Sequence, residues 1–247
     1  MPYHLVDYIE VDQIYNSSLF VKDAKAAEAK IRAAGRTPIF AGGTGMYLQA
    51  YFSGMDSLPQ ADGAIRAELA AYAEKHGKAA LHEQLTQVDP QSAAEIPAGN
   101  IHRVIRAIEI YRLTGKTASS QRTGKFNTQI AQDNFFIYLD WEKEALHKRI
   151  IQRTNNMFNG MCAETEALLK QGYTRETPAL KSLGYAQIID FIEGKLKREE
   201  ALERIIILTR QYAKRQRTWF MRYAGIKVIN AAAINPQAIA DEIKKIL

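Results

Sequence analysis

Apolar and polar positions follow two different rhythms along the first sixty residues. In segment 18–35, SLFVKDAKAAEAKIRAAG, apolar residues recur every three or four positions and the run ends at a glycine, which is typical of an amphipathic helix. Segment 37–41, TPIFA, is a short apolar run, and a glycine turn and a second helical pattern from about Met46 follow it. Helix, strand, turn and helix in this order predict an α/β unit.

Two further apolar runs predict two more strands, FFIYLDW at 135–141 and IKVINA at 226–231. The chain from 62 to 113 has helical spacing with breaks at VDP and PAGN, and the chain from 142 to 223 is mostly helical again. We therefore predict an α/β core with C-terminal helices, formed by residues 1–60 and 131–247. A helical domain, residues 61–130, is predicted to be inserted into this core.

The distribution of charge adds a partner to this picture. The formal net charge is +6, and segment 205–240 holds six Lys or Arg and no Asp or Glu, so this segment accounts for the whole excess. Tyr212, Trp219, Phe220 and Tyr223 are interleaved with these cations. Basic charge and aromatic rings on one element indicate a polyanion partner. A solvated helix with its aromatic residues in the core would show the same pattern, so both interpretations stay open at this point.

Composition excludes several classes of protein. No apolar run approaches the length of a membrane span, and the N-terminal segment MPYHLVDYIEVD lacks the pattern of a signal peptide. A single cysteine, Cys162, permits neither an internal disulfide nor a cysteine-based zinc site. The five histidines show no metal-binding spacing. We therefore predict a cytoplasmic protein that makes no contact with membranes.

Two glycine-containing stretches are candidates for a phosphate site. TGKT, 114–117, matches the tail of a P-loop, but Ile110 stands where the first glycine is required and the preceding segment is helical. We interpret it as a helix C-terminus with Gly115 at the stop position. AGGTG, 41–45, follows a predicted strand and opens a helix, so its backbone N–H groups and the Thr44 hydroxyl form the better anion site. A glycine turn that only reverses the chain would look the same.

Four separated stretches, in order along almost the whole chain, resemble one family. FAGGTGMYLQAYF resembles a GGTGLY segment, IHRVIRAIEIYRLTGKT resembles an R-x-x-RALE…TGK helix, and HKRIIQRTNNM is similar to an R-x-x-x-R-x-x-x-M stretch. The block from LGYAQIIDFIEG to TRQYAKRQRTWFMR is similar to GY…EG…TRQ-x-AKRQ-x-TW-x-R, and PYHLVD resembles a PHHLID-like segment. These motifs resemble those of the tRNA dimethylallyltransferases, or tRNA isopentenyltransferases. The resemblance implies a P-loop-NTPase-like parallel sheet with a helical insertion and a largely helical C-terminal part.

The resemblance implies transfer of a dimethylallyl group from dimethylallyl diphosphate to N6 of an adenosine next to the anticodon of certain tRNAs. Family members begin with a P-loop, a nucleotide- and ATP-binding motif, and a D-S-x-Q segment whose aspartate is taken to be the catalytic base. Both precede the PHHLID-like segment, at which this chain starts. We therefore expect an N-terminally truncated form with an incomplete sheet and without the general base. Mg²⁺ is expected for the complete enzyme, with no ligands found in this chain.

The resemblance also assigns roles to individual residues. Thr44 and Arg153 are the predicted catalytic groups, and Gly42, Gly43 and Thr44 are expected to bind the diphosphate. Outside the family pattern, Arg153 would equally be a surface arginine one turn from Arg149. The tRNA anticodon loop is expected to contact the inserted helical domain and the C-terminal block. The predicted tRNA-binding residues are Thr44, Arg66, His102, Arg103, Arg106, Lys181, Ser182, Gly184, Tyr185, Lys214, Arg215, Arg217, Trp219 and Arg222.

Three functions stay open on the sequence. The first is a bacterial-type enzyme fragment, since the chain lacks the C-terminal zinc finger of some eukaryotic relatives. The second is a non-catalytic RNA-binding protein that kept the basic helices. The third is an adenylate isopentenyltransferase acting on free nucleotides, although a small nucleotide does not require so extended a basic surface. We expect a monomer of marginal stability, because a sheet that lacks strands exposes unpaired backbone.

Overall fold

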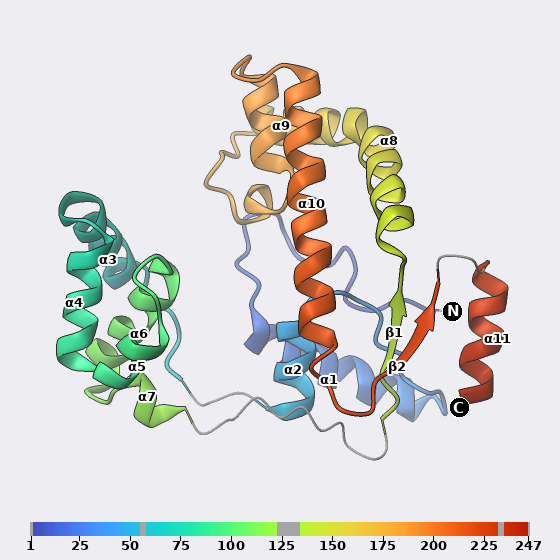
Figure 1. Cartoon of the computed structure of the whole chain (residues 1–247), viewed down its shortest axis with the longest axis horizontal. Helices are drawn as coiled ribbons and strands as arrows, with labels where there is room; N and C mark the ends of the chain where they lie inside the picture. The colour runs from blue at the N-terminus through green and yellow to red at the C-terminus, as the bar shows by residue number, and fades with distance from the viewer. Residues whose placement is uncertain (1, 55–57, 123–133, 232–234, 247) are drawn as a thin grey trace. The chain divides into compact units, whose positions relative to one another are not determined.

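The computed structural model describes residues 2–54, 58–122, 134–231 and 235–246. Its elements fall into two compact units, residues 1–53 with 128–247 and residues 54–127 (Figure 1). The first unit combines helices with two strands, and the elements described in the second unit are all helices. The predicted insertion, residues 61–130, overlaps the second unit.

The first unit begins with a helix that the apolar spacing predicted. Its elements are α1 (Ser17–Ala33), α2 (Gly45–Ser53), β1 (Ile137–Asp140), α8 (Lys143–Lys170), the 3-10 helix η1 (Pro178–Lys181), α9 (Tyr185–Ile192), α10 (Arg198–Phe220), β2 (Lys227–Asn230) and α11 (Pro236–Ile246). At the start of α1, Asn16 Oδ1 accepts hydrogen bonds from the backbone N–H groups of Ser18 and Leu19, both at 3.0 Å. Gly35, with φ 68°, follows its end.

The two strands pair in parallel, with Ile137 opposite Lys227 and Asp140 opposite Asn230. They confirm the predicted strands at 135–141 and 226–231 and the predicted parallel sheet. The predicted strand at 37–41 is wrong, because these residues form no strand. A strand exists only through backbone hydrogen bonds to a neighbour, and within the described ranges β1 and β2 pair only with each other.

Three helices of the first unit share an apolar core. Phe158 of α8, Ile188 of α9 and Ala201, Leu202 and Ile205 of α10 are buried together. This packing fixes α10, which carries most of the basic aromatic segment, against α8 and α9.

The second unit is built around α6. Its elements are α3 (Gly63–His76), α4 (Lys78–Val88), α5 (Pro90–Glu95), α6 (Ile101–Thr114) and α7 (Ala118–Gln121). The apolar spacing of α6 places Val104, Ile105 and Ile108 in one core with Leu81 and Leu85 of α4. The predicted helical character of 62–113 is therefore confirmed.

The TGKT stretch closes α6. Gly115 has φ 67°, in the left-handed region, and its N–H donates a hydrogen bond to Tyr111 O at 2.8 Å. TGKT is thus a helix C-terminus, as predicted, and not a phosphate-binding loop.

A buried carboxylate joins the beginnings of α5 and α7. Asp89 accepts hydrogen bonds from the N–H and hydroxyl groups of both Ser92 and Ser119, at 2.6 to 3.0 Å. Burial alone would raise the pKa of Asp89, but these hydrogen bonds outweigh burial and the pKa lies below its ordinary value. The charged Asp89 carboxylate therefore links two short helices, α5 and α7, by hydrogen bonds.

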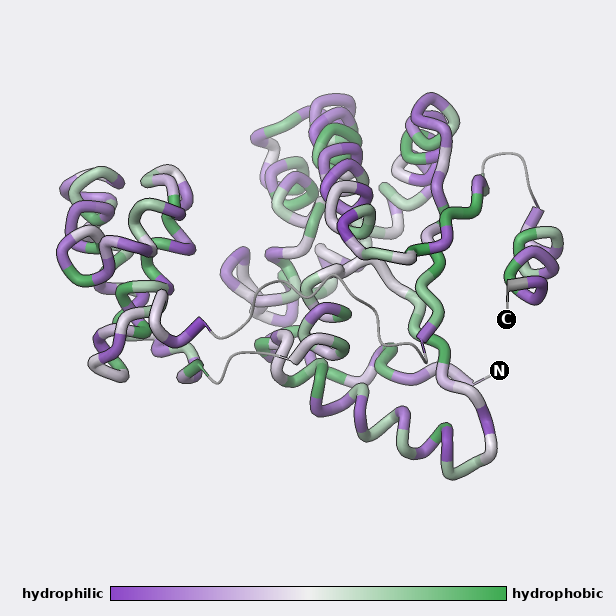
Figure 2. Tube along the Cα trace, turned by 60° about the horizontal axis from the view of Figure 1, so that its bottom comes forward, coloured by the Kyte–Doolittle hydropathy of each residue, from purple (hydrophilic) through white to green (hydrophobic). Residues whose placement is uncertain are grey.

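The sheet of the first unit leaves apolar surface in water. Phe135, Leu139 and Val228, on or beside the strands, are 58%, 43% and 49% exposed, and Ile39 is 71% exposed. Figure 2 shows hydrophobic segments, in green, along the two strands. A large apolar side chain left in water forgoes about 1.5–3 kcal/mol of burial free energy.

Within the described ranges, no helix is both long and apolar enough to cross a membrane.

We expect the sheet-containing unit to open before the helical unit. The amide hydrogens of β1 and β2 should exchange with solvent earlier than those of residues 104–110 in α6, which lie in a closed apolar core. Hydrogen exchange followed by mass spectrometry on the isolated chain measures both sets. A single cooperative transition at high temperature, with equal protection of β1 and α6, would contradict this expectation.

Candidate functional site

The glycine turn at 41–45 lies directly against α10. Gly43 O accepts a hydrogen bond from Gln216 Nε2 at 3.0 Å and one from the Tyr212 hydroxyl at 3.4 Å. The two donors are 173 and 169 positions away along the chain. The fold therefore brings together two segments that the sequence singled out separately, the glycine turn and the basic aromatic block.

Two of the glycines in this turn make room for α10. A Cβ atom on Gly45 would collide with the Trp219 ring, and one on Gly43 would collide with the end of the Gln216 side chain. Gly42 has nothing within 4 Å of the corresponding position. The Gly43 carbonyl and Gly45 thus serve packing, whereas Gly42 and the exposed Thr44 leave one side of the turn open to a ligand.

The first turn of α2 supplies hydrogen-bond donors beside Thr44. Tyr47 N–H donates to Thr44 O at 3.0 Å, which begins the helical ladder. The N–H groups before Tyr47 have no acceptor within the helix, as at the start of any helix, and the helix dipole is positive there. Phosphate oxygens are suited to such donors, so the geometry of Thr44 fits the predicted anion site.

Two cations of the basic block stand next to the aromatic residues of this contact. The Arg215 guanidinium lies 5.8 Å from the centre of the Tyr212 ring, and the Arg222 guanidinium lies 5.8 Å from the centre of the Trp219 ring. Trp219 contacts Gly45, and Tyr212 contacts Gly43. Trp219 therefore borders the glycine turn, and Arg222 and Arg215 lie beside the two aromatic residues that contact it. Arg215, Arg222 and Trp219 are all predicted tRNA-binding residues.

Lys214 and Arg217 occupy another side of α10. Lys214 stands about 200° from Gln216 around the helix axis, because each residue turns the helix by about 100°. Arg217 donates hydrogen bonds from Nε and Nη2 to Asp140 Oδ1 and Oδ2, at 3.2 and 3.4 Å. These hydrogen bonds raise the pKa of Arg217 and keep it charged. Asp140 ends β1, at the carboxyl edge of the sheet, where α/β folds commonly bind ligands.

Arg153, the second predicted catalytic group, contacts its own helix. It lies exposed on α8, and its Nε donates to Met157 Sδ at 3.3 Å, one turn further on. This hydrogen bond holds the guanidinium beside Met157, and a catalytic role for Arg153 stays a prediction.

The predicted tRNA-binding residues of KSLGY, 181–185, divide between surface and core. Lys181 pairs with Glu176 at 2.8 Å, and both Lys181 and Ser182 are exposed. Gly184 is buried with φ 100°, and a Cβ there would lie 3.0 Å from Met161 Cε, so it serves the packing of α9 on α8. The Tyr185 hydroxyl donates to Glu164 Oε2 at 2.9 Å, and burial, together with this hydrogen bond, raises the pKa of Tyr185 to about 12.

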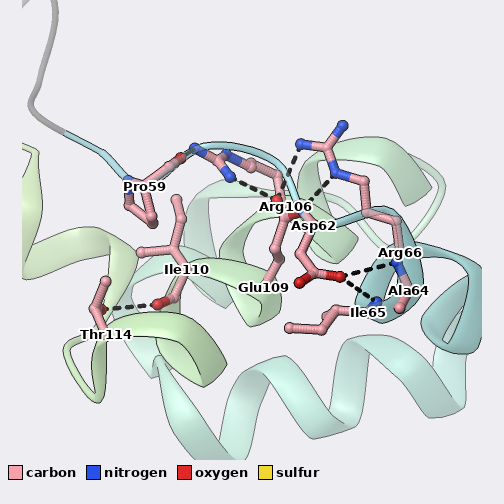
Figure 3. A network of polar contacts seen from close by, with 9 residues as sticks. All are labelled: Pro59, Asp62, Ala64, Ile65, Arg66, Arg106, Glu109, Ile110 and Thr114. Atoms are coloured by element: carbon pink, nitrogen blue, oxygen red, sulfur yellow. Dashed lines mark hydrogen bonds and ion pairs between the residues drawn. The ribbon is translucent and has the colours of Figure 1, made fainter.

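In the helical unit, Glu109 is the centre of a charged cluster that the sequence analysis missed. Its side chain is 0% exposed. It accepts hydrogen bonds from Arg66 Nε and Nη2 at 2.8 and 3.0 Å, from Arg106 Nη1 at 2.6 Å and from Asp62 N–H at 2.7 Å (Figure 3). The signal was present, because Glu109 stands directly between Ile108 and Ile110 in the buried part of α6. A carboxylate in a core position requires fixed partners.

Glu109 brings two predicted tRNA-binding residues, Arg66 and Arg106, to one point. Burial alone would raise the pKa of Glu109, but the hydrogen bonds from both arginines outweigh burial and the pKa lies below its ordinary value. Glu109 is therefore a permanent anion at neutral pH.

Two hollows in the helical unit contain the other predicted residues of this part. A hollow of about 420 Å³ is lined by Arg66, Glu74, Lys78 and His102 over an apolar floor that includes Ile105. A second hollow, of about 180 Å³, is lined on its polar side by Arg103, Arg106 and Arg122. Within residues 58–122, Arg103 has no ion-pair partner, whereas Arg122 pairs with Glu95 at 2.7 Å. Each hollow thus has one arginine that Glu109 holds.

Among the described residues, no group of three His, Cys, Asp or Glu side chains could hold a metal ion. The Mg²⁺ of the complete enzyme therefore remains an expectation from the resemblance, with no ligand set in these ranges.

Comparisons with known proteins agree on one family. Residues 1–223 match the family model described as IPP transferase. The chain is 56% identical over 240 residues to a tRNA dimethylallyltransferase from Elusimicrobium minutum, with 97% of this chain and 78% of that protein covered. It is 39% identical to one from Alkalilimnicola ehrlichii, with 92% and 72% covered.

Solved structures show the same fold. The tRNA isopentenylpyrophosphate transferase from Bacillus halodurans superposes with a TM-score of 0.67 at 30% identity, over 99% of this chain and 77% of that chain. A eukaryotic dimethylallyltransferase acting on tRNA superposes with a TM-score of 0.77 at 24% identity, over 100% of this chain and 64% of that chain. The predicted P-loop-NTPase-like α/β class is confirmed by these neighbours.

We expect Gly45→Ala to disturb the packing of α10 against the glycine turn and Gly42→Ala to leave this packing intact. The new Cβ at position 45 meets the rigid Trp219 ring, so the variant should lose about 1–3 kcal/mol of unfolding free energy. Position 42 opens to empty space, so its variant should stay within about 0.5 kcal/mol. Denaturant titration read by Trp219 fluorescence, in a Trp141→Phe background, measures both. Equal losses in the two variants would refute the close approach at Gly45.

Proposed function

This chain belongs to the IPP transferase family, whose members act in tRNA modification by dimethylallyl transfer, and we propose that its acceptor is N6 of an adenosine next to the anticodon. The proposed donor is dimethylallyl diphosphate. The observation that carries the proposal is the contact between the glycine turn and α10, which joins a helix start with free N–H donors, the predicted anion site, to a helix that carries cations and aromatic rings. We further propose that the protein works as a monomer in the cytoplasm and that the complete enzyme uses Mg²⁺.

The proposed reaction has two physical requirements. The exocyclic amine of adenine is a poor nucleophile, so a carboxylate must accept its proton, and the departing diphosphate must be stabilised as negative charge develops. The backbone N–H groups at the start of α2 and the Thr44 hydroxyl are donors for one end of that diphosphate. Arg153 remains a candidate second cation. The base is assigned to the D-S-x-Q segment of the family, which does not occur in these 247 residues.

The basic surfaces suit an RNA loop. A base in a loop can be turned out and stacked without melting a duplex, while its phosphate groups supply most of the affinity. Arg215 and Arg222 lie beside Tyr212 and Trp219, the aromatic residues that contact the glycine turn, and Lys214 and Arg217 offer a second line of charge on α10. We propose that the anticodon loop lies along α10 with its target adenine toward Thr44.

For the 247-residue chain by itself, we propose RNA binding without turnover. Neither a G-x-x-x-x-G-K-[ST] motif nor a D-S-x-Q segment is present in this sequence. The parts that bind RNA would then be separable from the parts that complete the chemistry.

We expect the double substitution Lys214→Ala with Arg217→Ala to weaken tRNA binding and reduce its salt dependence. Each lost phosphate contact should lower the slope of log K against log [salt] by about 0.7–0.9, so the pair should lower it by roughly one to two units. Fluorescence anisotropy with labelled tRNA at several salt concentrations gives the slope. The control is Lys244→Ala with Lys245→Ala, the same charge change on α11, where both lysines already pair with acidic neighbours. An unchanged slope in the α10 variant would remove this face from the RNA surface.

We expect no prenyl transfer by the isolated chain in an assay with tRNA, dimethylallyl diphosphate and Mg²⁺. The reason is that the D-S-x-Q segment, to which the family resemblance assigns the proton acceptor, does not occur among these 247 residues. Incorporation of labelled dimethylallyl groups into tRNA measures the activity, and the Elusimicrobium minutum relative serves as the positive control. Turnover at an ordinary enzymatic rate would show that the base lies within these residues.

A further inference from the structure

Burying the Glu109 carboxylate costs desolvation free energy. It lies in the buried stripe of α6 between Ile108 and Ile110, with no exposed side-chain surface. Replacing a buried ion pair by apolar residues of similar volume is often neutral or stabilising. Stability alone therefore gives little reason for a carboxylate at position 109. Its role is better sought in the two arginines that it binds.

The carboxylate holds two guanidinium groups in fixed orientations. Arg66 binds both carboxylate oxygens through Nε and Nη2, the two-pronged geometry that specifies direction as well as distance. Arg106 is fixed from two sides, by Glu109 Oε2 and by Pro59 O, each at 2.6 Å. Neither side chain can turn without breaking a hydrogen bond to a rigid acceptor.

Both guanidinium groups keep donors for a further ligand. A guanidinium has five N–H donors, and each of these arginines uses two of them in the bonds to Glu109 and Pro59. Figure 3 shows one terminal nitrogen of Arg66 pointing away from the carboxylate. The side chains of Arg66 and Arg106 are 45% and 28% exposed. Arg66 lines the larger hollow beside Lys78, His102 and the carboxylate Glu74, and Arg106 lines the smaller one beside Arg103 and Arg122.

We propose that Glu109 is a positioning residue that presents Arg66 and Arg106, already oriented, to phosphodiester groups of the RNA at the two hollows. The role rests on the proposed function, because it needs an RNA ligand. Two arginines and one carboxylate leave one net positive charge. Glu109 therefore weakens the electrostatic attraction of the site for RNA, but it fixes the orientation of both guanidinium groups. Ordering before binding lowers the conformational-entropy cost of each side chain that the RNA would otherwise have to immobilise.

The sign of one substitution separates positioning from simple charge attraction. Glu109→Gln removes a buried negative charge close to the RNA, so attraction alone predicts tighter binding. Positioning predicts weaker binding, by about five- to tenfold, because the amide keeps one acceptor oxygen in place of two and loses the charge, so that the arginines are no longer both held and must be ordered by the RNA. The slope of log K against log [salt] should stay unchanged, because both cations are still present. Anisotropy with a labelled anticodon stem–loop, at a temperature where circular dichroism shows the variant folded, measures affinity and slope.

The matched control is Glu68→Gln. Glu68 pairs with Arg112 at 2.9 Å, but its side chain is 65% exposed and it holds neither of the two site arginines. It removes the same charge from a neighbouring helix, and we expect unchanged or slightly tighter binding. Affinity of folded Glu109→Gln equal to or above that of the unchanged chain would overturn the positioning role, while the proposed function would stand. If the unchanged chain does not bind the stem–loop, the proposed function fails and the positioning role fails with it.

A second variant decides the question if Glu109→Gln does not fold. Arg66→Lys keeps the charge but has no second prong for the carboxylate. Positioning predicts that its affinity falls close to that of Arg66→Gln, with the salt slope of the unchanged chain. Affinity equal to that of the unchanged chain would show that Arg66 acts as a point charge and would overturn the proposal.

Discussion

The contact of Trp219 with Gly45 is the constraint on which the candidate site depends. A side chain at position 45 would occupy the space of the indole ring, and the Gly43 carbonyl would lose its two donors on α10. Without this contact, the helix start that offers N–H groups to a phosphate and the helix that carries the cations would be separate surfaces. The first role of the glycines in this turn is thus to let the side chains of α10 come close. Binding of an anion by their backbone N–H groups is the second, predicted role.

The helical unit uses the opposite device. Its two buried carboxylates, Asp89 and Glu109, each accept four hydrogen bonds from named donors. A buried anion with a complete set of partners fixes the donors around it, because a lost hydrogen bond would leave charge unpaired in a medium of low dielectric constant. In the first unit, close packing decides the geometry. In the second unit, paired charge decides it.

Sequence patterns predicted the helices and two of the three strands, because these depend on local spacing that the fold does not override. The run TPIFA failed as a strand because strand formation needs a partner, which no local pattern reports. Glycine spacing located the turn at 41–45, but not the role of Gly45, since that depends on Trp219 far along the chain. Glu109 was missed because a family motif drew attention to its arginines and not to the acceptor between them. Individual roles in RNA binding remain predictions, because no bound ligand tests them.

The two buried carboxylates of the helical unit, Glu109 and Asp89, bind residues near the first and last helices of that unit. Asp62, just before α3, is tied to α6 through Glu109, and Ser119 in α7 is tied to the start of α5 through Asp89. Tension on either connecting segment would therefore meet a hydrogen-bonded carboxylate before it reached the apolar interior. The helices of this unit would therefore keep their angles to one another under such a load.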